Sequence, residues 1–523
     1  MIVSHPCRII DTAWMATRKT ATVPVLDAQL LSSASRRANK TRMSTGTFFW
    51  HDYETFGADP RRDRPSQFAG VRTTLDLEIV GEPLQLYCQP PRDVLPHPEA
   101  CLLTGITPQI AAREGVLETE FAARIHEALA EPGTCGVGYN SLRFDDEVTR
   151  HLLYRNFHDP YAREWEHGNS RWDLIDLLRL CYALRPDGMQ WPLRDDGVPS
   201  FRLGDLTAAN HLAHANAHDA LSDVHATIAL ARLIRIRQPR LFNYFFELRR
   251  KQKVFGLLDY THMTPLLHAS SRYPASRGCL AMIAPLSAHP TQPNGVIVID
   301  LDADPTDLIE LDAEDIADRV FTPRADLPED VIRIPLKTVH ANRSPALAPL
   351  SALNGVDLAR IQLDPERCQR HLLMLREVDG IAEKVRKVFA AATPFDAAID
   401  PELALYAGFP SDADKRLMRE VRHLSPQLLA THTPVFRDAR YAELLFRYRA
   451  RNFPDTLNPA ERKRWHVFRQ TRLTTQSPGT TLTLTDYFAI IATHRENADL
   501  PSSQHAVLDA LQAWGQELSR EIT

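Results

Sequence analysis

The segment from about 47 to 236 constrains the fold most strongly, because its predicted strands and helices alternate. It opens with the run TFFWHDYE at 47–54, which is aromatic-rich and typical of a strand. Hydrophobic periodicity predicts further strands at 70–75, 83–88 and 135–139, and helices at 118–129, 144–154, 173–184 and 220–236. Strands followed by strand–helix alternation predict an α/β domain with a mixed sheet flanked by helices.

The rest of the chain divides into three parts. Residues 239–392 contain short predicted strands at 279–283, 295–301 and 331–335 and end with a helix at 368–389, which indicates a small, mostly β module. Residues 393–523 have a helical pattern. Residues 1–46 are rich in Ala, Ser, Thr and Arg, and we expect a disordered extension there. A transit peptide, or a true start at Met43, are alternatives for this extension.

Composition excludes several classes of protein. Hydrophobic residues make up 44% and charged residues 24% of the 523 residues, ordinary values for a globular protein. No run approaches the roughly 18 apolar residues of a membrane span. The net charge of -5 excludes a uniformly basic surface but allows a local basic groove. The seven cysteines form no C-x-x-C pair, so we expect reduced thiols and a cytoplasmic location.

Two acids lie two positions apart on the first predicted strand. Asp52 and Glu54 therefore leave the same face of that strand. Burying two carboxylates is costly unless they are paired or bind a metal, and Mg²⁺ prefers such oxygen ligands. The alternative is an edge strand with a solvated acidic face.

A histidine and an acid flank the start of the helix predicted at 220–236. His218 can accept a proton near neutral pH, and Asp223 can reach the same cavity. In the plainer interpretation Asp219 caps the helix and His218 is a surface residue. A His-Asp pair also occurs in the HD phosphohydrolase superfamily, but His211 and His214 do not lie on the separate helices that this superfamily needs.

A third acid follows the strand predicted at 135–139. Asp145 lies at the start of the next helix, where acids suit the helix dipole. It can equally point into the cleft at the carboxyl ends of the strands, where α/β sheets bind ligands.

The order of these elements is more specific than any one of them. D-x-E on the first strand, a later aspartate and H-x-x-x-x-D at a late helix resemble the DEDD exonuclease superfamily, in the branch with histidine as its fifth residue. Further motifs resemble the bacterial exonuclease I family. They are HDYETFG (51–57), RPSQFA (64–69), LTGITP (103–108), GYNSLRFDDEVTR (138–150), NSRWD (169–173), PSFRL (199–203), RQPRLF (237–242), GFPSDAD (408–414) and YRARNFP (448–454).

The resemblance implies a ribonuclease H-like nuclease domain at 47–236, an SH3-like domain at 239–392 and a helical domain at 393–523. It implies digestion of single-stranded DNA from the 3′ end to 5′-mononucleotides, with roles in DNA repair and recombination. Two Mg²⁺ ions, which Mn²⁺ can replace, would serve a two-metal hydrolysis. The implied metal ligands are Asp52, Glu54, Asp145 and Asp223, and His218 becomes the general base.

The resemblance also implies residues that contact the substrate. Arg202 has the planar fork that suits phosphate, and Glu54 also contacts the substrate. The other implied DNA contacts are Arg150, Tyr161, Trp165, Arg179, Asn294, Lys337, His340, Asn342 and Arg343. A surface salt bridge is the alternative for Arg202, and core packing is the alternative for Tyr161 and Trp165.

The implied protein partner is the acidic C-terminal tail of single-stranded-DNA-binding protein. Arg185 and Tyr244 match positions near its site, and such a tail needs a basic rim around an apolar pocket. We expect a monomer that does not contact membranes. Two alternatives remain: a nuclease of this superfamily acting on RNA or short oligonucleotides, and a non-catalytic DNA-binding scaffold.

Overall fold

The computed structural model describes residues 46–214, 218–329, 331–390 and 400–523. The extension predicted at 1–46 therefore lies outside the described residues, apart from Gly46. Among the described helices, none combines the length and apolar character needed to cross a membrane. The six cysteines in the described part of the chain are all free and buried.

The first sheet is a five-stranded mixed sheet with β1 (Thr47–Thr55) at its centre. Its order is β3-β2-β1-β4-β5, where the other strands are β2 (Pro65–Thr74), β3 (Leu84–Tyr87), β4 (Thr134–Gly138) and β5 (Ser170–Asp173). β1 pairs antiparallel with β2 and parallel with β4, and β4 pairs parallel with β5. The predicted mixed sheet is confirmed, although the sequence pattern did not indicate β5.

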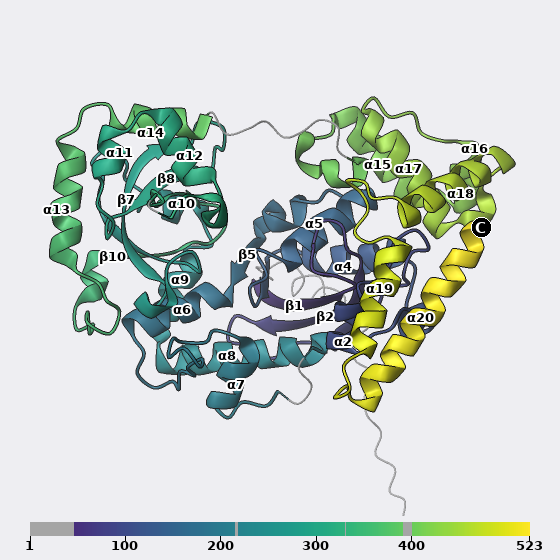
Figure 1. Ribbon diagram of the computed structural model, residues 1–523, viewed down its shortest axis with the longest axis horizontal. Helices are drawn as coiled ribbons and strands as arrows, with labels where there is room; N and C mark the ends of the chain where they lie inside the picture. The colour runs from purple at the N-terminus through teal and green to yellow at the C-terminus, as the bar shows by residue number, and fades with distance from the viewer. Residues whose placement is uncertain (1–45, 215–217, 330, 391–399) are drawn as a thin grey trace, which may run out of the picture. The chain divides into compact units, whose positions relative to one another are not determined.

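Helices cover both faces of this sheet. Successive side chains of β1 alternate between the two faces, so its neighbouring apolar residues need a core on each side. Trp50 packs in one core with residues of α8 (Ala220–Arg237), which runs along β1 and β2 (Figure 1). Phe49 packs in a separate core with residues of α4 (Glu118–Ala130) and α5 (Asp145–Arg155). Asp52 and Glu54 share the parity of Trp50, so they leave the sheet on the face that α8 covers.

This part contains further helices besides α4, α5 and α8. They are α2 (Pro98–Thr104), α3 (Pro108–Glu114), α6 (Leu174–Leu184), α7 (Leu203–Ala209), α9 (Pro239–Glu247) and α10 (Lys251–Phe255). The predicted helices at 118–129, 144–154, 173–184 and 220–236 are confirmed within a few residues.

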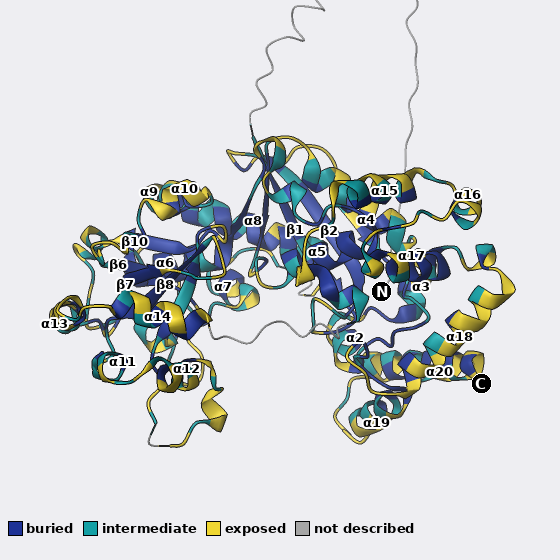
Figure 2. Ribbon diagram, turned by 90° about the horizontal axis from the view of Figure 1, so that it is seen from above, coloured by how far each residue is buried: buried dark blue, intermediate teal, exposed yellow. Residues whose placement is uncertain are grey.

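A second five-stranded sheet is entirely antiparallel, in the order β10-β6-β7-β8-β9. Its strands are β6 (Leu266–Ala269), β7 (Leu280–Ala288), β8 (Gly295–Asp300), β9 (Leu336–His340) and β10 (Ala346–Pro349). The helices around it are α11 (Thr306–Glu310), α12 (Ala313–Phe321), α13 (Pro365–Arg376) and α14 (Ile381–Ala390). The strands expected at 279–283 and 295–301 are confirmed, and Figure 2 shows the buried strands in dark blue. The expectation of a mostly β module is wrong, because helices α11 to α14 together contain more residues than the five strands.

Two predictions about single elements of this second part are also wrong. The strand expected at 331–335 is irregular, and β9 begins only at Leu336. Pro335 explains the difference, because proline has no N–H for a sheet and restricts the residue before it. The single helix expected at 368–389 is two helices, α13 and α14, and Gly380 between them has a left-handed φ of 79°. Helix α13 ends at Arg376, and Gly380, which adopts a left-handed conformation readily, lies in the turn directly before α14.

The last part of the chain is helical, as predicted. It contains the 3₁₀ helix η6 (Pro401–Ala407) and helices α15 (Asp412–His423), α16 (Pro426–Thr431), α17 (Ala439–Asn452), α18 (Pro459–Thr474), α19 (Leu484–Arg495) and α20 (Ser502–Ile522). α19 and α20 pack against each other, and α20 also packs on α2 and α3. η6 packs on α5 and so lies next to the helix that carries Asp145.

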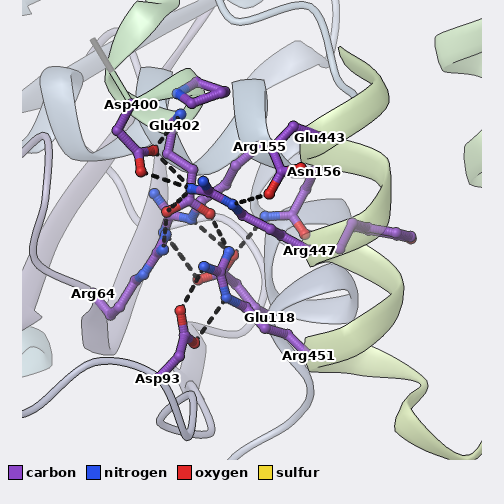
Figure 3. Close-up of polar contacts among 12 residues, drawn as sticks. Arg64, Asp93, Glu118, Arg155, Asn156, Asp400, Glu402, Glu443, Arg447 and Arg451 are labelled. Carbon is purple, nitrogen blue, oxygen red and sulfur yellow. Dashed lines mark hydrogen bonds and ion pairs between the residues drawn. The ribbon is translucent and has the colours of Figure 1, made fainter. Parts of the chain in front are cut away.

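Buried ion pairs join this helical part to the first sheet (Figure 3). Glu402 on η6 accepts hydrogen bonds from Arg451 on α17 and from Arg64, whose Nη2 is 2.8 Å from Glu402 Oε2. Arg451 also contacts Asp93, with 2.7 Å between Nη2 and Oδ2. All four side chains are buried. Burial raises the pKa of Glu402, but the guanidinium groups of Arg451 and Arg64 outweigh it and hold that pKa well below its usual range.

Candidate active site

Asp52 and Glu54 lie at the carboxyl end of β1, on the face covered by α8. Asp52 is half-buried and Glu54 is 9% exposed. Burial and the nearby charges of Asp145 and Glu54 raise the pKa of Asp52 well above its usual value. Burial and the charges of Asp223 and Asp145 raise the pKa of Glu54 to about 8. The end of β1 therefore carries acids whose charges repel one another.

Asp145 reaches the same place from the first residue of α5. Its Oδ1 accepts a hydrogen bond from the backbone N–H of Tyr53 at 3.1 Å, and Tyr53 lies between the two acids of β1. Burial raises the pKa of Asp145 well above its usual value, and the charge of Asp146 adds to that rise.

The adjacent acid, Asp146, has a different environment. Its carboxylate accepts hydrogen bonds from Arg163 at 2.6 Å and Arg171 at 2.8 Å, and all three side chains are buried. Burial raises the pKa of Asp146, but the charges of Arg171 and Arg163 outweigh it and leave that pKa far below normal. Asp146 is thus neutralised within the protein, whereas Asp145 adds charge to the acid cluster.

A buried carboxylate fixes the turn that leads to Asp145. Asp173, the N-cap of α6, accepts hydrogen bonds from the backbone N–H groups of Asn140 at 2.9 Å and Leu142 at 3.1 Å. Asn140 has a left-handed φ of 61°, a conformation that asparagine tolerates better than most residues. A side chain on Gly138 would lie 3.0 Å from the backbone oxygen of His51, so this turn passes close to β1.

The first turn of α8 completes the cluster. The Asp219 side chain accepts a hydrogen bond from the Ser222 N–H, which confirms Asp219 as the N-cap. His218 precedes it with a left-handed φ of 66° and an exposed side chain. One ligand atom each from Glu54, His218 and Asp223 lie within 4.8 Å of one another. A strained histidine next to buried acids is typical of a functional site.

Two polar residues hold the α8 side of this cluster. Gln67 of β2 donates to Asp219 at 3.2 Å and accepts from the Ala220 N–H at 3.2 Å, which ties the start of α8 to the sheet. His214 Nε2 is 2.5 Å from Asp223 Oδ1, and His214 Nδ1 is 3.1 Å from Thr207 Oγ1. His214 therefore acts as a partner of Asp223.

The donor set fits a divalent cation. Carboxylates and an imidazole are metal ligands, and Glu54, His218 and Asp223 lie close enough to share one ion. The main charges that perturb the pKa values of Asp52 and Glu54 are all acidic, and neither residue forms an ion pair with an arginine or lysine among the described residues. Bound cations would relieve this repulsion, with Asp52 and Asp145 as further ligands.

A groove of about 1410 Å³ lies between residues of the first part and the second sheet. Its walls carry the basic side chains Arg143, Arg272, Lys337, His340 and Arg343, and the turn residues Asn140 and Asp173. Three of the predicted DNA contacts, Lys337, His340 and Arg343, line it.

Comparisons with known proteins follow the same division of the chain. Residues 49–231 match the family model described as exonuclease, residues 249–391 the exonuclease I SH3-like domain, and residues 399–518 the exonuclease I C-terminal domain. Exodeoxyribonuclease I of Escherichia coli is 49% identical over 419 residues, which cover 80% of this chain and 88% of the relative. The chain belongs to the exonuclease I family.

Solved structures of exonuclease I give the same result. Exonuclease I from Methylocaldum szegediense matches with a TM-score of 0.87 at 53% identity, covering 90% of this chain and 99% of that one. E. coli exonuclease I in complex with a dA16 oligonucleotide matches with a TM-score of 0.87 at 46% identity. The match covers 90% of this chain and 100% of that one. A zinc-bound form of the E. coli complex with single-stranded DNA matches with a TM-score of 0.86 at 45% identity. The match covers 91% of this chain and 100% of that one. The protein is accordingly an enzyme of the nuclease class.

The other residues assigned from the exonuclease I resemblance have varied environments. Arg150 is buried and bonds to Glu147 at 2.6 Å and to Glu164 at 2.8 Å, and Arg179 bonds to Asp176. Trp165 is 65% exposed, which excludes core packing, and Tyr161 is half-buried. Arg202 is exposed at the start of α7.

Two asparagines lie beside β9 of the exonuclease I SH3-like part. The backbone oxygen of Asn294 accepts from the Ala341 N–H at 2.8 Å. The backbone oxygen of Asn342 accepts from Arg171 at 3.2 Å, so the same arginine contacts both Asp146 and the second sheet. Neither asparagine is among the groove-lining residues.

The two residues assigned to partner binding lie just after α6 and on α9, two helices that contact each other. Arg185, which follows α6, donates to the Ala352 backbone oxygen at 3.0 Å. Tyr244 on α9 is half-buried, and its hydroxyl is buried without a hydrogen-bond partner among the described residues.

Sequence reasoning missed the supporting residues of this exonuclease I site. Gln67, Asp173 and His214 hold site residues but carry no spacing that marks them as functional. Gln67 and Asp173 do lie inside the RPSQFA and NSRWD motifs, which was the available signal.

Proposed function

We propose that this exonuclease I family member degrades single-stranded DNA in the 3′ to 5′ direction and releases 5′-mononucleotides. The observation that carries this proposal is the convergence of Asp52, Glu54, Asp145 and Asp223 with His218 at one end of the central strand. We assign the four acids as ligands of Mg²⁺ and His218 as the general base. Roles in DNA repair and recombination follow from the substrate.

The reaction adds water across one phosphodiester bond. Water attacks the phosphorus and gives a proton to the His218 imidazole, which is exposed and within reach of solvent. The bond between phosphorus and the 3′ oxygen of the remaining strand breaks, and that oxygen takes up a proton from solvent. When bound, divalent cations supply positive charge that offsets the charge developing on the phosphodiester.

The chain's own residues determine how precisely these groups are placed. The Tyr53 N–H holds Asp145 against β1, and Gln67 holds the start of α8 against β2. His214 holds Asp223 in its orientation. Such support for reacting groups lowers the cost of reorganisation during the reaction.

The groove supports single-stranded DNA as the substrate. Lys337, His340 and Arg343 line it together with Arg143. Phosphates bind such side chains without regard to sequence. A local concentration of these side chains can attract DNA although the whole chain has a net charge of -5. Arg150, Arg179, Arg202, Asn294, Asn342, Tyr161 and Trp165 are proposed as further contacts, with aromatic rings stacking on bases.

The surface around Arg185 and Tyr244 is proposed to bind the acidic tail of single-stranded-DNA-binding protein. Arg185 supplies positive charge, and the half-buried ring of Tyr244 contributes apolar surface. We propose that the protein acts as a monomer in the cytoplasm, where its buried free cysteines stay reduced.

The test of this function is a single-stranded DNA labelled at its 5′ end, incubated with Mg²⁺ or with EDTA. We expect the labelled strand to shorten stepwise in Mg²⁺, and not in EDTA or with Asp52→Asn. Immediate release of a labelled mononucleotide would reverse the proposed polarity. Bound but undigested DNA would favour a non-catalytic scaffold, and preferential digestion of a matched RNA would favour an RNA substrate.

A further inference from the structure

His214 lies beside the acid cluster but takes no part in the proposed chemistry. It comes four residues before His218 in the sequence, and its side chain is 8% exposed. Its Nε2 is 2.5 Å from Oδ1 of Asp223. An ionised carboxylate only accepts hydrogen bonds, so Nε2 is the donor and this oxygen of Asp223 is engaged by the protein itself.

The His214 ring is held at its other nitrogen as well. Nδ1 lies 3.1 Å from Oγ1 of Thr207, a buried residue of α7. The Thr207 hydroxyl in turn donates to the Leu203 backbone oxygen at 2.9 Å, which fixes it to its own helix. Because α7 packs on α8, the imidazole is fixed between these two helices with Nε2 directed at the first turn of α8.

The second carboxylate oxygen of Asp223 is in a different position. It accepts no hydrogen bond from the described residues, and Asp223 can share one cation with Glu54 and His218. A cation that bound Asp223 through both oxygens would have to displace Nε2 of His214. The structure therefore presents Asp223 as a ligand with one available oxygen.

The number of oxygens that a carboxylate offers bears on the choice of metal. Mg²⁺ demands a nearly ideal octahedron with ligands at about 2.1 Å, whereas Ca²⁺ takes roughly six to eight oxygens at about 2.3–2.6 Å and accepts carboxylates through both oxygens. The two oxygens of one carboxylate lie closer together than adjacent corners of the Mg²⁺ octahedron. A carboxylate limited to one oxygen therefore favours the smaller ion.

We propose that His214 is a positioning residue that restricts Asp223 to one metal-binding oxygen and thereby selects Mg²⁺ over Ca²⁺. The inference rests on the proposed function, which makes Asp223 a Mg²⁺ ligand. Residues that orient metal ligands in this way typically change metal affinity by about 10- to 100-fold when they are replaced.

A direct bond from His214 to the cation is the competing role. Two donor atoms at right angles on one cation, with bonds of about 2.1 Å, lie about 3 Å apart. Nε2 of His214 and Oδ1 of Asp223 are closer than that, at 2.5 Å. His214 also lies outside the group of ligand atoms that Glu54, His218 and Asp223 bring together. The geometry favours a role through Asp223.

The test measures cation binding to the protein without DNA. The electron paramagnetic resonance signal of free Mn²⁺ reports its occupancy, and displacement by Mg²⁺ or Ca²⁺ gives the affinity for each ion. We expect His214→Leu to weaken Mg²⁺ binding about 10-fold while Ca²⁺ binding is kept or strengthened. The ratio of the two affinities should thus shift at least about 10-fold toward Ca²⁺.

Two further variants complete the comparison. His214→Gln can direct an amide N–H at Asp223, so we expect it to return the affinity ratio to within about 3-fold of wild type. His225→Leu makes the same change at an exposed position of α8 and should keep the wild-type ratio. Thermal unfolding of every variant is recorded on the same samples.

An unchanged ratio in His214→Leu would overturn the inference, and so would an equal loss of affinity for both ions, which a merely structural role predicts. A loss of Zn²⁺ affinity with an unchanged Mg²⁺ to Ca²⁺ ratio would make His214 a ligand and overturn it as well. If His214→Leu does not fold, Thr207→Val, which removes the contact at Nδ1, must shift the ratio in the same direction or the inference fails.

Digestion of the 5′-labelled strand by the wild-type protein in Mg²⁺ is followed in parallel. If the wild type digests the strand while His214→Leu keeps the wild-type affinity ratio, the inference about His214 alone fails. If the wild type neither binds these cations nor digests the strand, the proposed function fails with it.

Discussion

The backbone N–H of Tyr53 donates a hydrogen bond to Asp145 Oδ1 at 3.1 Å. Because Tyr53 separates Asp52 from Glu54 on β1, this bond fixes an acid from α5 beside the two acids of the strand. Thr149, one turn further along α5, reinforces the contact, with its Oγ1 3.0 Å from the Tyr53 hydroxyl. The cluster is therefore built where the central strand meets the helix that follows its parallel neighbour.

Adjacent acids should respond oppositely to the same substitution. Asp145→Asn removes a proposed metal ligand and relieves repulsion, so we expect nuclease activity to fall at least about 1000-fold with no loss of stability. Asp146→Asn leaves Arg163 and Arg171 buried beside a neutral amide, so we expect it to destabilise the fold by about 3–5 kcal/mol. Activity assays and urea unfolding of both variants check this. Equal stability of the two variants would contradict it.

Metal binding should strengthen as the pH rises. The folded, metal-free protein raises the pKa of Glu54 from its ordinary value of 4.5 to about 8, so the folded state binds more protons than the unfolded state between these values. The stability contributed by this group is therefore lost as pH rises toward 8. Below about pH 8 Glu54 carries a proton, which a cation must displace in order to bind. We expect Mg²⁺ affinity to increase from about pH 6 to about pH 8 and then level off.

Calorimetry in two buffers of different ionisation enthalpy measures that proton release directly. Glu54→Gln should reduce both the proton release and the dependence of Mg²⁺ affinity on pH. A Mg²⁺ affinity independent of pH would contradict the raised pKa of Glu54.

DNA binding should weaken at alkaline pH through Lys337. Burial lowers the pKa of Lys337 to about 8, and the charges of Arg143 and Arg272 contribute to that shift. Lys337 is thus charged below about pH 8 and loses its charge above it, so its attraction for phosphate declines as pH rises. Fluorescence anisotropy in EDTA measures the affinity. Lys337→Arg, which keeps its charge, should flatten the decline, and an unchanged pH dependence in this variant would exclude Lys337 as its source.

The buried ion pairs of Glu402 should make the protein sensitive to acid. Burial raises the pKa of Asp93, but Arg451 and Arg472 outweigh it and lower that pKa to about 2. A lowered carboxylate pKa gives stability that is present above the unfolded value, near 4, and is lost as pH falls toward 2. We expect unfolding to begin in this range.

Removing one partner tests the same network at neutral pH. Glu402→Gln removes the anion that Arg64 contacts at 2.8 Å and leaves Arg451 with Asp93 as its remaining anion, so we expect a loss of about 3–5 kcal/mol. Glu496→Gln, on the exposed C-cap of α19, is the matched control and should change stability by less than about 0.5 kcal/mol. Similar unfolding midpoints for both variants would contradict a stabilising role for the network.

The sequence predicted the elements that carry the site because their patterns are local. The strand at 47–54 and the helix at 220–236 have clear periodicity, and Asp219 is a typical N-cap. The break at Gly380 and the late start of β9 were missed, since a hydrophobic pattern continues across both. β5 was missed because it is only four residues long and is set by pairing with β4.

The environment of each acid could not be predicted from spacing. Asp145 and Asp146 are equivalent in the sequence, and only the folded positions of Arg163 and Arg171 distinguish them. The same holds for His214, whose contact with Asp223 no spacing in the sequence marks. Contacts between residues distant in sequence carry this information.

The most direct test of the proposed site is the single-turnover rate of DNA cleavage in Mg²⁺, measured for wild type, Asp52→Asn and His218→Ala. DNA affinity and thermal unfolding of each variant are recorded on the same samples. We predict that both variants fold and bind DNA, and that cleavage falls at least about 1000-fold for Asp52→Asn and about 100-fold or more for His218→Ala. Cleavage at the wild-type rate by either folded variant would contradict the assignment of that residue to the chemistry.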